Sequence, residues 1–182
     1  VYPTFRPDAA MRLEDPAAWN TWTEKLASIT GESCATLASF LSALRGRHDF
    51  FHAMGCRLSD HGLSAMDTGT ATDGETSDIF QMARLRRPVS PDKIARFRSH
   101  LMLFFGQLDA EKGWTKQLHL GALRGNNTRL LRQLGPDTGF DSIGDFPQAS
   151  ALAAYLDRLD QENALPKTVI YNLNPADNYV FA

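Results

Sequence analysis

TVIYNL, residues 168–173, is the stretch that decides the fold class, because it has the composition of a buried β-strand. Pro166 stands just before it, and the pair Asn174-Pro175 follows it. β-Branched and aromatic residues enclosed between such breakers are typical of a short strand in a sheet core. We predict a buried strand over residues 168–173.

Three stretches further back along the chain have the same strand character. They are QLHLGAL (117–123), GCRLS (55–59) and VYPTF (1–5). Long segments with helix signals separate them, and two of these segments begin with a capping residue before proline, at Asp15-Pro16 and Ser90-Pro91. Strands that alternate with helices predict an α/β fold with a parallel sheet.

The predicted helices show apolar residues at the 3.6-residue period. They cover residues 15–29, 36–54, 91–113 and 147–163. The first carries four apolar residues on one face: Trp19, Trp22, Leu26 and Ile29. The apolar stripe of the second runs to Met54. The stretch 63–77 is rich in Gly, Thr, Ser and Asp, and it predicts a loop without regular structure.

The overall composition is that of one ordinary globular domain. The chain has 182 residues, of which 43% are hydrophobic and 22% charged, and its formal net charge is −2. This balance predicts neither a nucleic acid nor a membrane as partner, and no apolar run approaches the ~20 residues of a membrane span. The two cysteines, Cys34 and Cys56, have no metal-type spacing. We therefore expect a cytoplasmic protein.

Polar side chains stand at or just after the end of every predicted strand. They are Arg6, Asp8, Asp60, His61, His119, Arg124, Asn126 and Asn172. In α/β folds, ligands bind at the carboxyl ends of parallel strands, where such side chains meet. The sequence therefore predicts one polar, partly cationic pocket.

Four of these residues have both a chemical and a structural interpretation. Arg6 has the planar fork that clamps a carboxylate, or it forms an ion pair with Asp8. His61 is a metal ligand or acid–base group, or an oriented loop histidine. His119 alternates with leucines inside a strand, so it is either a satisfied core histidine or a functional group facing a barrel interior. For Asn126, helix capping is the structural alternative to ligand binding.

Five stretches together resemble uronate isomerase, the glucuronate and galacturonate isomerase of the amidohydrolase superfamily. They are YPTFRPD (2–8), GCRLSDHGL (55–63), GWTKQLHLGALRGNNTR (113–129), LGPDTGFDSIGD (134–145) and LPKTVIYNLNPADN (165–178). Their order and spacing match across nearly the whole chain. The combination is specific, although each stretch alone is a weak signal.

The resemblance implies an α/β fold that is a partial TIM (β/α)8 barrel of about four parallel strands. Residues 1–182 would form a single partial barrel domain, with helical insertions at about 15–54 and 77–112. The implied activity is aldose–ketose isomerisation of hexuronates: D-glucuronate to D-fructuronate and D-galacturonate to D-tagaturonate. The implied partners are a small-molecule hexuronate and, in the complete enzyme, further copies of itself in a homo-oligomer.

The resemblance also implies roles for Arg6, His61 and His119, and position at a strand end adds Asp60, Arg124, Asn126 and Asn172 as candidates. The catalytic candidates are His119, His61 and Asp60. Arg6 matches the family's arginine for the substrate carboxylate, and the other substrate-binding candidates are Arg124, Asn126 and Asn172. A divalent metal, zinc in the first instance, is implied for the complete enzyme. His119 is a candidate ligand, and the main ligands, among them the family's His-x-His pair, are expected outside these 182 residues.

Four strands cannot close an eight-stranded barrel, so we expect the chain to be inactive alone. The alternative is a non-catalytic sugar-acid-binding module that reuses the half-barrel. An α/β hydrolase is disfavoured, because the sequence contains no G-x-S-x-G motif.

Overall fold

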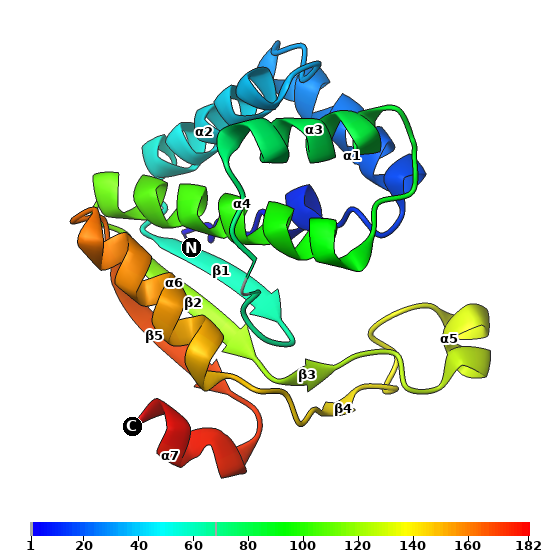
Figure 1. The fold of residues 1–182 in the computed structure, drawn as a ribbon, viewed down its shortest axis with the longest axis vertical. Helices are drawn as coiled ribbons and strands as arrows, with labels where there is room; N and C mark the ends of the chain where they lie inside the picture. The colour runs from blue at the N-terminus through cyan, green and yellow to red at the C-terminus, as the bar shows by residue number, and fades with distance from the viewer. Residues whose placement is uncertain (1, 68) are drawn as a thin grey trace.

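The computed structural model describes residues 2–67 and 69–182 as helices packed on a small parallel sheet (Figure 1). Its helices are α1 (Pro16–Thr30), α2 (Leu37–Ala53), α3 (Asp73–Arg84), α4 (Pro91–Glu111), α5 (Thr128–Leu134), α6 (Ala149–Gln161) and α7 (Asn178–Phe181). Its strands are β1 (Leu58–Leu63), β2 (Thr115–Leu120), β3 (Ala122–Leu123), β4 (Ser142–Ile143) and β5 (Lys167–Asn172). Two 3₁₀ turns complete it, η1 (Asp8–Met11) and η2 (Pro175–Asp177). The predicted α/β fold with a parallel sheet is confirmed.

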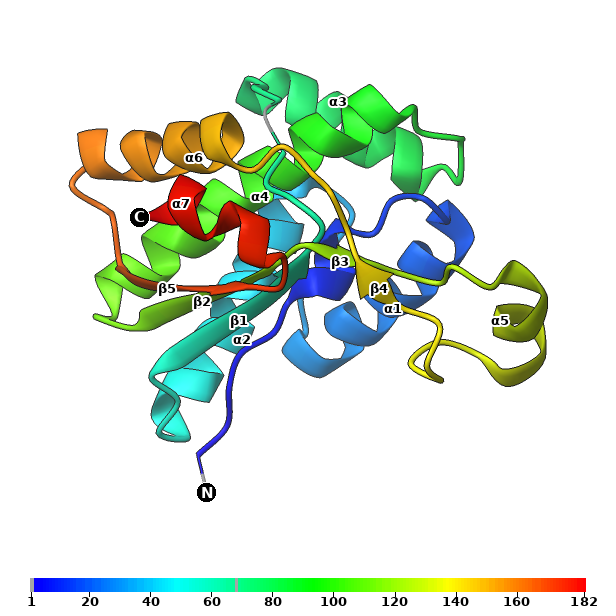
Figure 2. The same ribbon diagram turned by 90° about the horizontal axis from the view of Figure 1, so that it is seen from below.

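The main sheet has the strand order β1-β2-β5, and both neighbouring pairs are parallel. Gly62, His119 and Tyr171 stand side by side across the three strands. Figure 2 shows the three strands next to one another, with α4 and α6 on one side. Because the strands are parallel, their carboxyl ends meet at one edge of the sheet, and the polar residues near those ends are brought together.

The predicted strand over residues 1–5 is wrong as a full strand. Phe5 forms a single parallel bridge with Ser59, and Tyr2–Thr4 have no strand structure. Val1 lies outside the described residues. The bridge consists of two backbone hydrogen bonds, Phe5 N to Leu58 O at 3.1 Å and Asp60 N to Phe5 O at 2.9 Å. It is nevertheless enough to fix Arg6 beside the end of β1.

The other three predicted strands also begin and end at different residues from those predicted, and glycines explain two of these differences. Gly55 has φ +90°, and Cys56 N still donates to Phe51 O, so residues 55–57 finish the turn after α2 and β1 begins only at Leu58. Gly121, with φ +98°, separates β2 from the short β3. β3 then pairs antiparallel with β4 in a second sheet.

The predicted loop over residues 63–77 ends earlier than expected, because α3 begins at Asp73. Thr72 caps this helix: its side chain accepts from Glu75 N, and the Glu75 side chain accepts from Thr72 N in return. This reciprocal capping box is a strong helix start that the loop-like composition concealed. Thr68, in the same predicted loop, lies outside the described residues. The predicted cap of α1 is confirmed, since Asp15 Oδ1 accepts from Ala17 N and Ala18 N.

The predicted apolar faces extend too far at the ends of two helices. Trp19 and Leu26 are buried, but Ile29 is 64% exposed. Met54, predicted as the end of the next apolar stripe, is 55% exposed. The last buried residue is Leu26 in α1 and His48 in α2, so both errors fall after the packed interface has ended.

The two faces of the main sheet differ in what covers them. On one face alternate residues are buried beneath the helices: Ser59, His61, Lys116, Leu118 and Leu120. On the other face the alternate residues of β2 and β5 keep contact with solvent, among them Gln117, His119, Val169 and Tyr171. We call this second side the open face. The prediction that the strand over residues 168–173 is buried is wrong for this face, since Val169 and Tyr171 are 39% and 44% exposed. Within the described part of the chain, no helix has the length and apolarity needed to cross a membrane.

Candidate functional site

A pocket of about 250 Å³ opens where the three parallel strands end. Its lining consists of Arg6, Gly62, Leu63, Ser64, His119, Ala122, Arg124, Tyr171 and Leu173. A wider cleft of about 830 Å³ adjoins it and shares Arg6, Gly62 and Arg124 with it. The pocket lies at the carboxyl edge of the sheet, where the sequence predicts a site, and two arginines and a histidine line it together with apolar side chains.

Asp60 joins two of the expected site residues. Its Oδ2 accepts a hydrogen bond from Arg6 Nη1 at 3.0 Å, and its Oδ1 lies 2.8 Å from His119 Nε2. The second contact does not have the angle of a hydrogen bond, so Oδ1 is buried without a hydrogen-bond donor among the described residues. The structure thus brings Arg6, Asp60 and His119 together from three separate parts of the chain.

The ring of His119 lies on the open face, with 47% of the side chain exposed. It stacks on Tyr171 with ring centroids 4.5 Å apart and an interplanar angle of 10°. The Tyr171 hydroxyl donates to Gln117 Oε1 at 3.0 Å. The sequence analysis overlooked Tyr171, although the alternation of β5 places it on the face opposite its neighbour Asn172.

Asp8 and the backbone of Gly62 fix the position of Arg6. Its Nε donates to Asp8 Oδ2 at 3.1 Å, and the same oxygen accepts from Gly62 N at 2.9 Å. A Cβ at Gly62 would overlap Nη2 of Arg6, so the guanidinium lies directly against the backbone of β1. The ion pair with Asp8, the structural alternative weighed from the sequence, is therefore present, and it leaves Arg6 in the lining of the pocket.

The expectation that His61 presents a metal-binding or acid–base group to the pocket is wrong. His61 is adjacent to Asp60 on β1, so its side chain points to the opposite, helix-covered face, where it is 0% exposed. Its Nδ1 is 3.0 Å from Asp8 Oδ1 and its Nε2 is 3.0 Å from Lys116 Nζ. Burial, and after it the charge of Lys116, lowers the pKa of His61, which favours the neutral imidazole.

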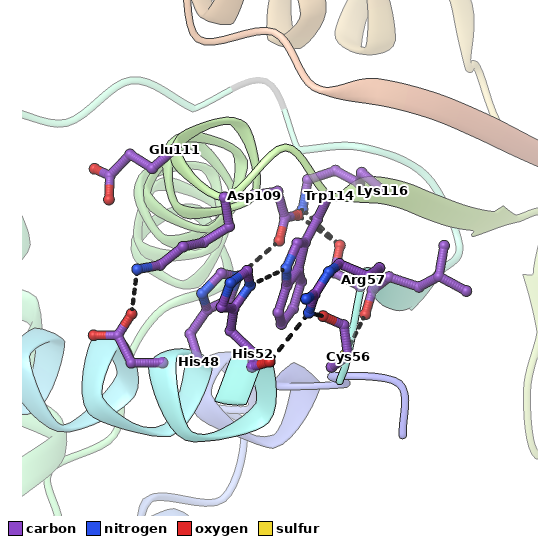
Figure 3. A network of polar contacts seen from close by, with 12 residues as sticks. His48, His52, Cys56, Arg57, Asp109, Glu111, Trp114 and Lys116 are labelled. Atoms are coloured by element: carbon purple, nitrogen blue, oxygen red, sulfur yellow. Dashed lines mark hydrogen bonds and ion pairs between the residues drawn. The ribbon is translucent and has the colours of Figure 1, made fainter. Parts of the chain in front are cut away.

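A buried polar network lies behind His61. Asp109 accepts hydrogen bonds from His48 Nε2 at 3.1 Å and from Ser59 Oγ at 2.6 Å, and Lys116 Nζ is 2.7 Å from its Oδ2. Figure 3 shows Asp109 at the end of α4 with His48 and Lys116 around it. Burial raises the pKa of Asp109, but the Lys116 charge and these hydrogen bonds outweigh it, so the pKa lies below its ordinary value.

Lys116 is a second residue that the sequence analysis overlooked. The signal was a lysine that alternates with Leu118 and Leu120, because that pattern places a charge on the buried face of a strand. Such a charge needs partners inside the protein. Lys116 is 0% exposed, and burial lowers the pKa of its amine although Asp109 opposes this effect.

The other three expected substrate-binding residues lie at different distances from the pocket. Arg124 lines it, and its Nη1 donates to Asp141 Oδ2 at 2.6 Å. Asn126 donates to Leu123 O and Ser142 Oγ, so it braces the pair β3–β4. Asn172 donates to Asn174 O and to Asn178 Oδ1 and is not part of the lining. In this structure both asparagines therefore tie loops together.

The described residues do not complete a metal site. No group of three His, Cys, Asp or Glu side chains arranged for metal binding occurs in residues 2–67 and 69–182. Asp60 Oδ1, which lacks a hydrogen-bond donor, and His119 Nε2 are two suitable donor atoms. Zinc in a catalytic site takes three protein ligands, so these two atoms are at most part of such a site.

The chain is similar to proteins of one family over its entire length. The family model described as glucuronate isomerase matches residues 1–182. A uronate isomerase of Opitutus terrae is 60% identical over the 182 residues, and one of Solibacter usitatus is 57% identical. In both cases all of this chain is covered, and it spans 39% of the length of the relative.

Two solved structures have the same fold. The crystal structure of a uronate isomerase from Thermotoga maritima matches 97% of this chain with a TM-score of 0.90 and 33% sequence identity, over 38% of its own length. A glucuronate isomerase from Caulobacter crescentus matches 97% of the chain with a TM-score of 0.85 and 28% identity, over 36% of its own length. With the family match over every residue, these similarities show that the chain belongs to the glucuronate isomerase family.

Proposed function

We propose that the full-length protein interconverts hexuronates and their ketose forms, D-glucuronate with D-fructuronate and D-galacturonate with D-tagaturonate. The observation that carries this proposal is the joint placement of Arg6 and His119 on Asp60, at a pocket formed by the strand ends. A fixed cation beside a titratable group suits a substrate that has a carboxylate at one end and a reacting carbonyl at the other.

Each residue then has a defined task. The free edge of the Arg6 guanidinium pairs with the substrate carboxylate, and Arg124 adds positive charge at the rim of the pocket. By the proton-transfer route, His119 takes a proton from one of the two reacting carbons and returns it to the other, while the hydroxyl proton moves between the two oxygens on these carbons. An imidazole is a suitable acid and base near neutral pH. Asp60 holds Arg6 and the His119 ring in a fixed relation to each other.

We further propose that the complete enzyme uses a divalent metal, zinc in the first instance. Its function would be that of a Lewis acid at the substrate oxygens. Asp60 Oδ1 is one donor atom, and His119 Nε2 is a second if His119 binds the metal instead of carrying the proton. The remaining ligands would have to come from residues other than those described.

We also propose that the chain forms one part of a (β/α)8 barrel, as a single partial barrel domain. The open face supports this proposal, because it carries His119, Gln117 and Tyr171 at positions that face the interior of a closed barrel. The three-stranded sheet is also too small to enclose a substrate. We therefore expect the 182-residue chain alone to be inactive.

The first experiment is an isomerisation assay of the full-length protein with D-glucuronate and D-galacturonate. We expect both aldoses to be converted to their ketoses, and D-glucose to react at least about a hundredfold less efficiently, because Arg6 then has no carboxylate to bind. Product formation is followed by proton NMR. Uronate binding in calorimetry without any conversion would instead support the non-catalytic sugar-acid-binding module.

The Gly62→Ala substitution tests whether the position of Arg6 determines substrate binding. A methyl group at residue 62 would overlap Arg6 Nη2 and force the guanidinium away from β1. We expect the KM for hexuronate to rise by about tenfold, with a small change in kcat. Gly74→Ala is the matched control, because the nearest heavy atom to its new Cβ is Thr72 Oγ1 at 3.9 Å. A KM equal to that of the wild type would contradict the assignment of Arg6.

A further inference from the structure

The side-chain amine of Lys116 is buried, and three buried acceptor atoms surround it. Its Nζ lies 2.7 Å from Asp109 Oδ2, 3.0 Å from His61 Nε2 and 3.4 Å from Ser59 Oγ. A protonated lysine has three N–H donors and no acceptor. The ammonium therefore has one ion-pair partner and two hydrogen-bond acceptors, as many partners as it has N–H groups.

This arrangement fixes the tautomer of His61. Because an ammonium only donates, His61 Nε2 must accept, and the ring proton is then on Nδ1. Nδ1 in turn donates to Asp8 Oδ1 at 3.0 Å. The contact with Lys116 therefore fixes the His61 ring so that its Nδ1 proton points at Asp8.

The other oxygen of Asp8 contacts two residues that line the pocket, Gly62 and Arg6. Oδ2 accepts from Gly62 N at 2.9 Å and from Arg6 Nε at 3.1 Å. Arg6 Nη1 is held by Asp60, whereas Nη2 donates no hydrogen bond within residues 2–67 and 69–182. The contacts thus run from Lys116 through His61 and Asp8 to the Arg6 guanidinium, which lines the pocket.

We propose that His61 is a positioning residue for substrate binding: anchored by Lys116, it holds Asp8 so that Asp8 aligns Arg6 for the substrate carboxylate. This proposal rests on the proposed function for its effect on catalysis. It replaces the catalytic role expected from the sequence, since a side chain that is 0% exposed cannot touch a substrate. Lys116, which is three contacts from Arg6, would thereby affect how Arg6 binds the substrate carboxylate.

Two substitutions at position 61 separate the two hydrogen bonds of the ring. In His61→Asn, the amide nitrogen stands near the position of Nδ1, so the donor to Asp8 is kept and the contact with Lys116 is lost. In His61→Gln, the amide reaches the position of Nε2, so the contact with Lys116 is kept and the donor to Asp8 is lost. Both variants remove part of a buried ring, so each serves as the packing control of the other.

In the full-length protein we expect the KM for D-glucuronate to rise by about tenfold in His61→Gln and to stay within about threefold of the wild type in His61→Asn, with kcat little changed in both. A merely structural role would lower the activity of both variants together with their melting temperatures. Equal KM values in the two variants, or a loss confined to kcat, would overturn the proposal. Asp8→Asn leaves a single acceptor oxygen for three donors, His61 Nδ1, Gly62 N and Arg6 Nε, so its KM should also rise by about tenfold, and it serves if His61→Gln does not fold.

Crystal structures of the two full-length variants test the same idea without any substrate. The contact between Asp8 Oδ2 and Arg6 Nε should persist in His61→Asn and be lost in His61→Gln. An unmoved Arg6 in His61→Gln would overturn the positioning role even if the protein isomerises uronates. A displaced Arg6 in a protein without isomerase activity would uphold the positioning role and reject the proposed function instead.

Discussion

His119→Asn lowers kcat for hexuronate isomerisation by roughly 10²–10⁴-fold in the full-length protein, if the imidazole carries the proton as proposed. Asparagine has no group that titrates near neutral pH, and its shorter side chain cannot reach Asp60 as Nε2 of His119 does at 2.8 Å. The stacking on Tyr171 is lost as well. Steady-state kinetics with D-glucuronate measure the effect.

The metal content of the same variant separates two roles of His119. A large loss of kcat with unchanged bound metal indicates proton transfer, and a parallel loss of metal indicates that His119 is a ligand. His100→Asn is the matched control, because His100 belongs to α4 and is not part of the pocket lining. A kcat of His119→Asn within about threefold of the wild type would refute both roles.

Lys116→Met destabilises the fold by about 3–5 kcal/mol, because it leaves the buried carboxylate of Asp109 without its charged partner. It also removes the donor to His61 Nε2. Methionine has a similar length and fits the space of the lysine stem. Urea unfolding of the full-length protein measures the loss as a lower midpoint at an unchanged slope.

Lys112→Met provides the comparison for Lys116→Met. Lys112 Nζ also pairs with a carboxylate, Asp49, at 2.8 Å, but these side chains are 31% and 48% exposed. Removing such a surface pair costs at most about 1 kcal/mol. The double variant Lys116→Met with Asp109→Asn should recover part of the loss, since no unpaired charge then remains. If Lys112→Met and Lys116→Met lowered the free energy of unfolding equally, the buried pair would contribute no more to stability than the surface pair.

The sequence predicted the fold class because the strands alternate with helices that have clear caps. The resemblance to uronate isomerase is confirmed by the match of the family model over residues 1–182. The errors were local. The run QLHLGAL was predicted as one strand, but Gly121 adopts a positive φ that divides it, and such a turn does not show in hydrophobicity. The loop prediction over residues 63–77 overlooked the capping box of α3 because glycine and threonine dominate its composition.

The site was predicted in part, and strand alternation accounts for the difference. Asp60 and His61 were chosen together because both follow an apolar run, but neighbours in a strand face opposite sides of the sheet. Arg6, Asp60 and His119 meet only through the register of β1 with β2 and the bridge at Phe5, and the sequence does not specify that register. The catalytic and substrate-binding assignments stay predictions, as do the preferred uronate, the homo-oligomer and the cytoplasmic location.

The alternation along β1 has a practical consequence for library design. Three consecutive residues fall into two classes: Gly62 lines the pocket and Asp60 binds Arg6, which also lines it, whereas His61 between them belongs to the interior. A saturation library meant to change substrate preference should therefore vary every second codon of this strand and leave position 61 constant. If all three positions were randomised, some variants would change substrate recognition and others would misplace Arg6, and a screen for activity could not distinguish the two effects.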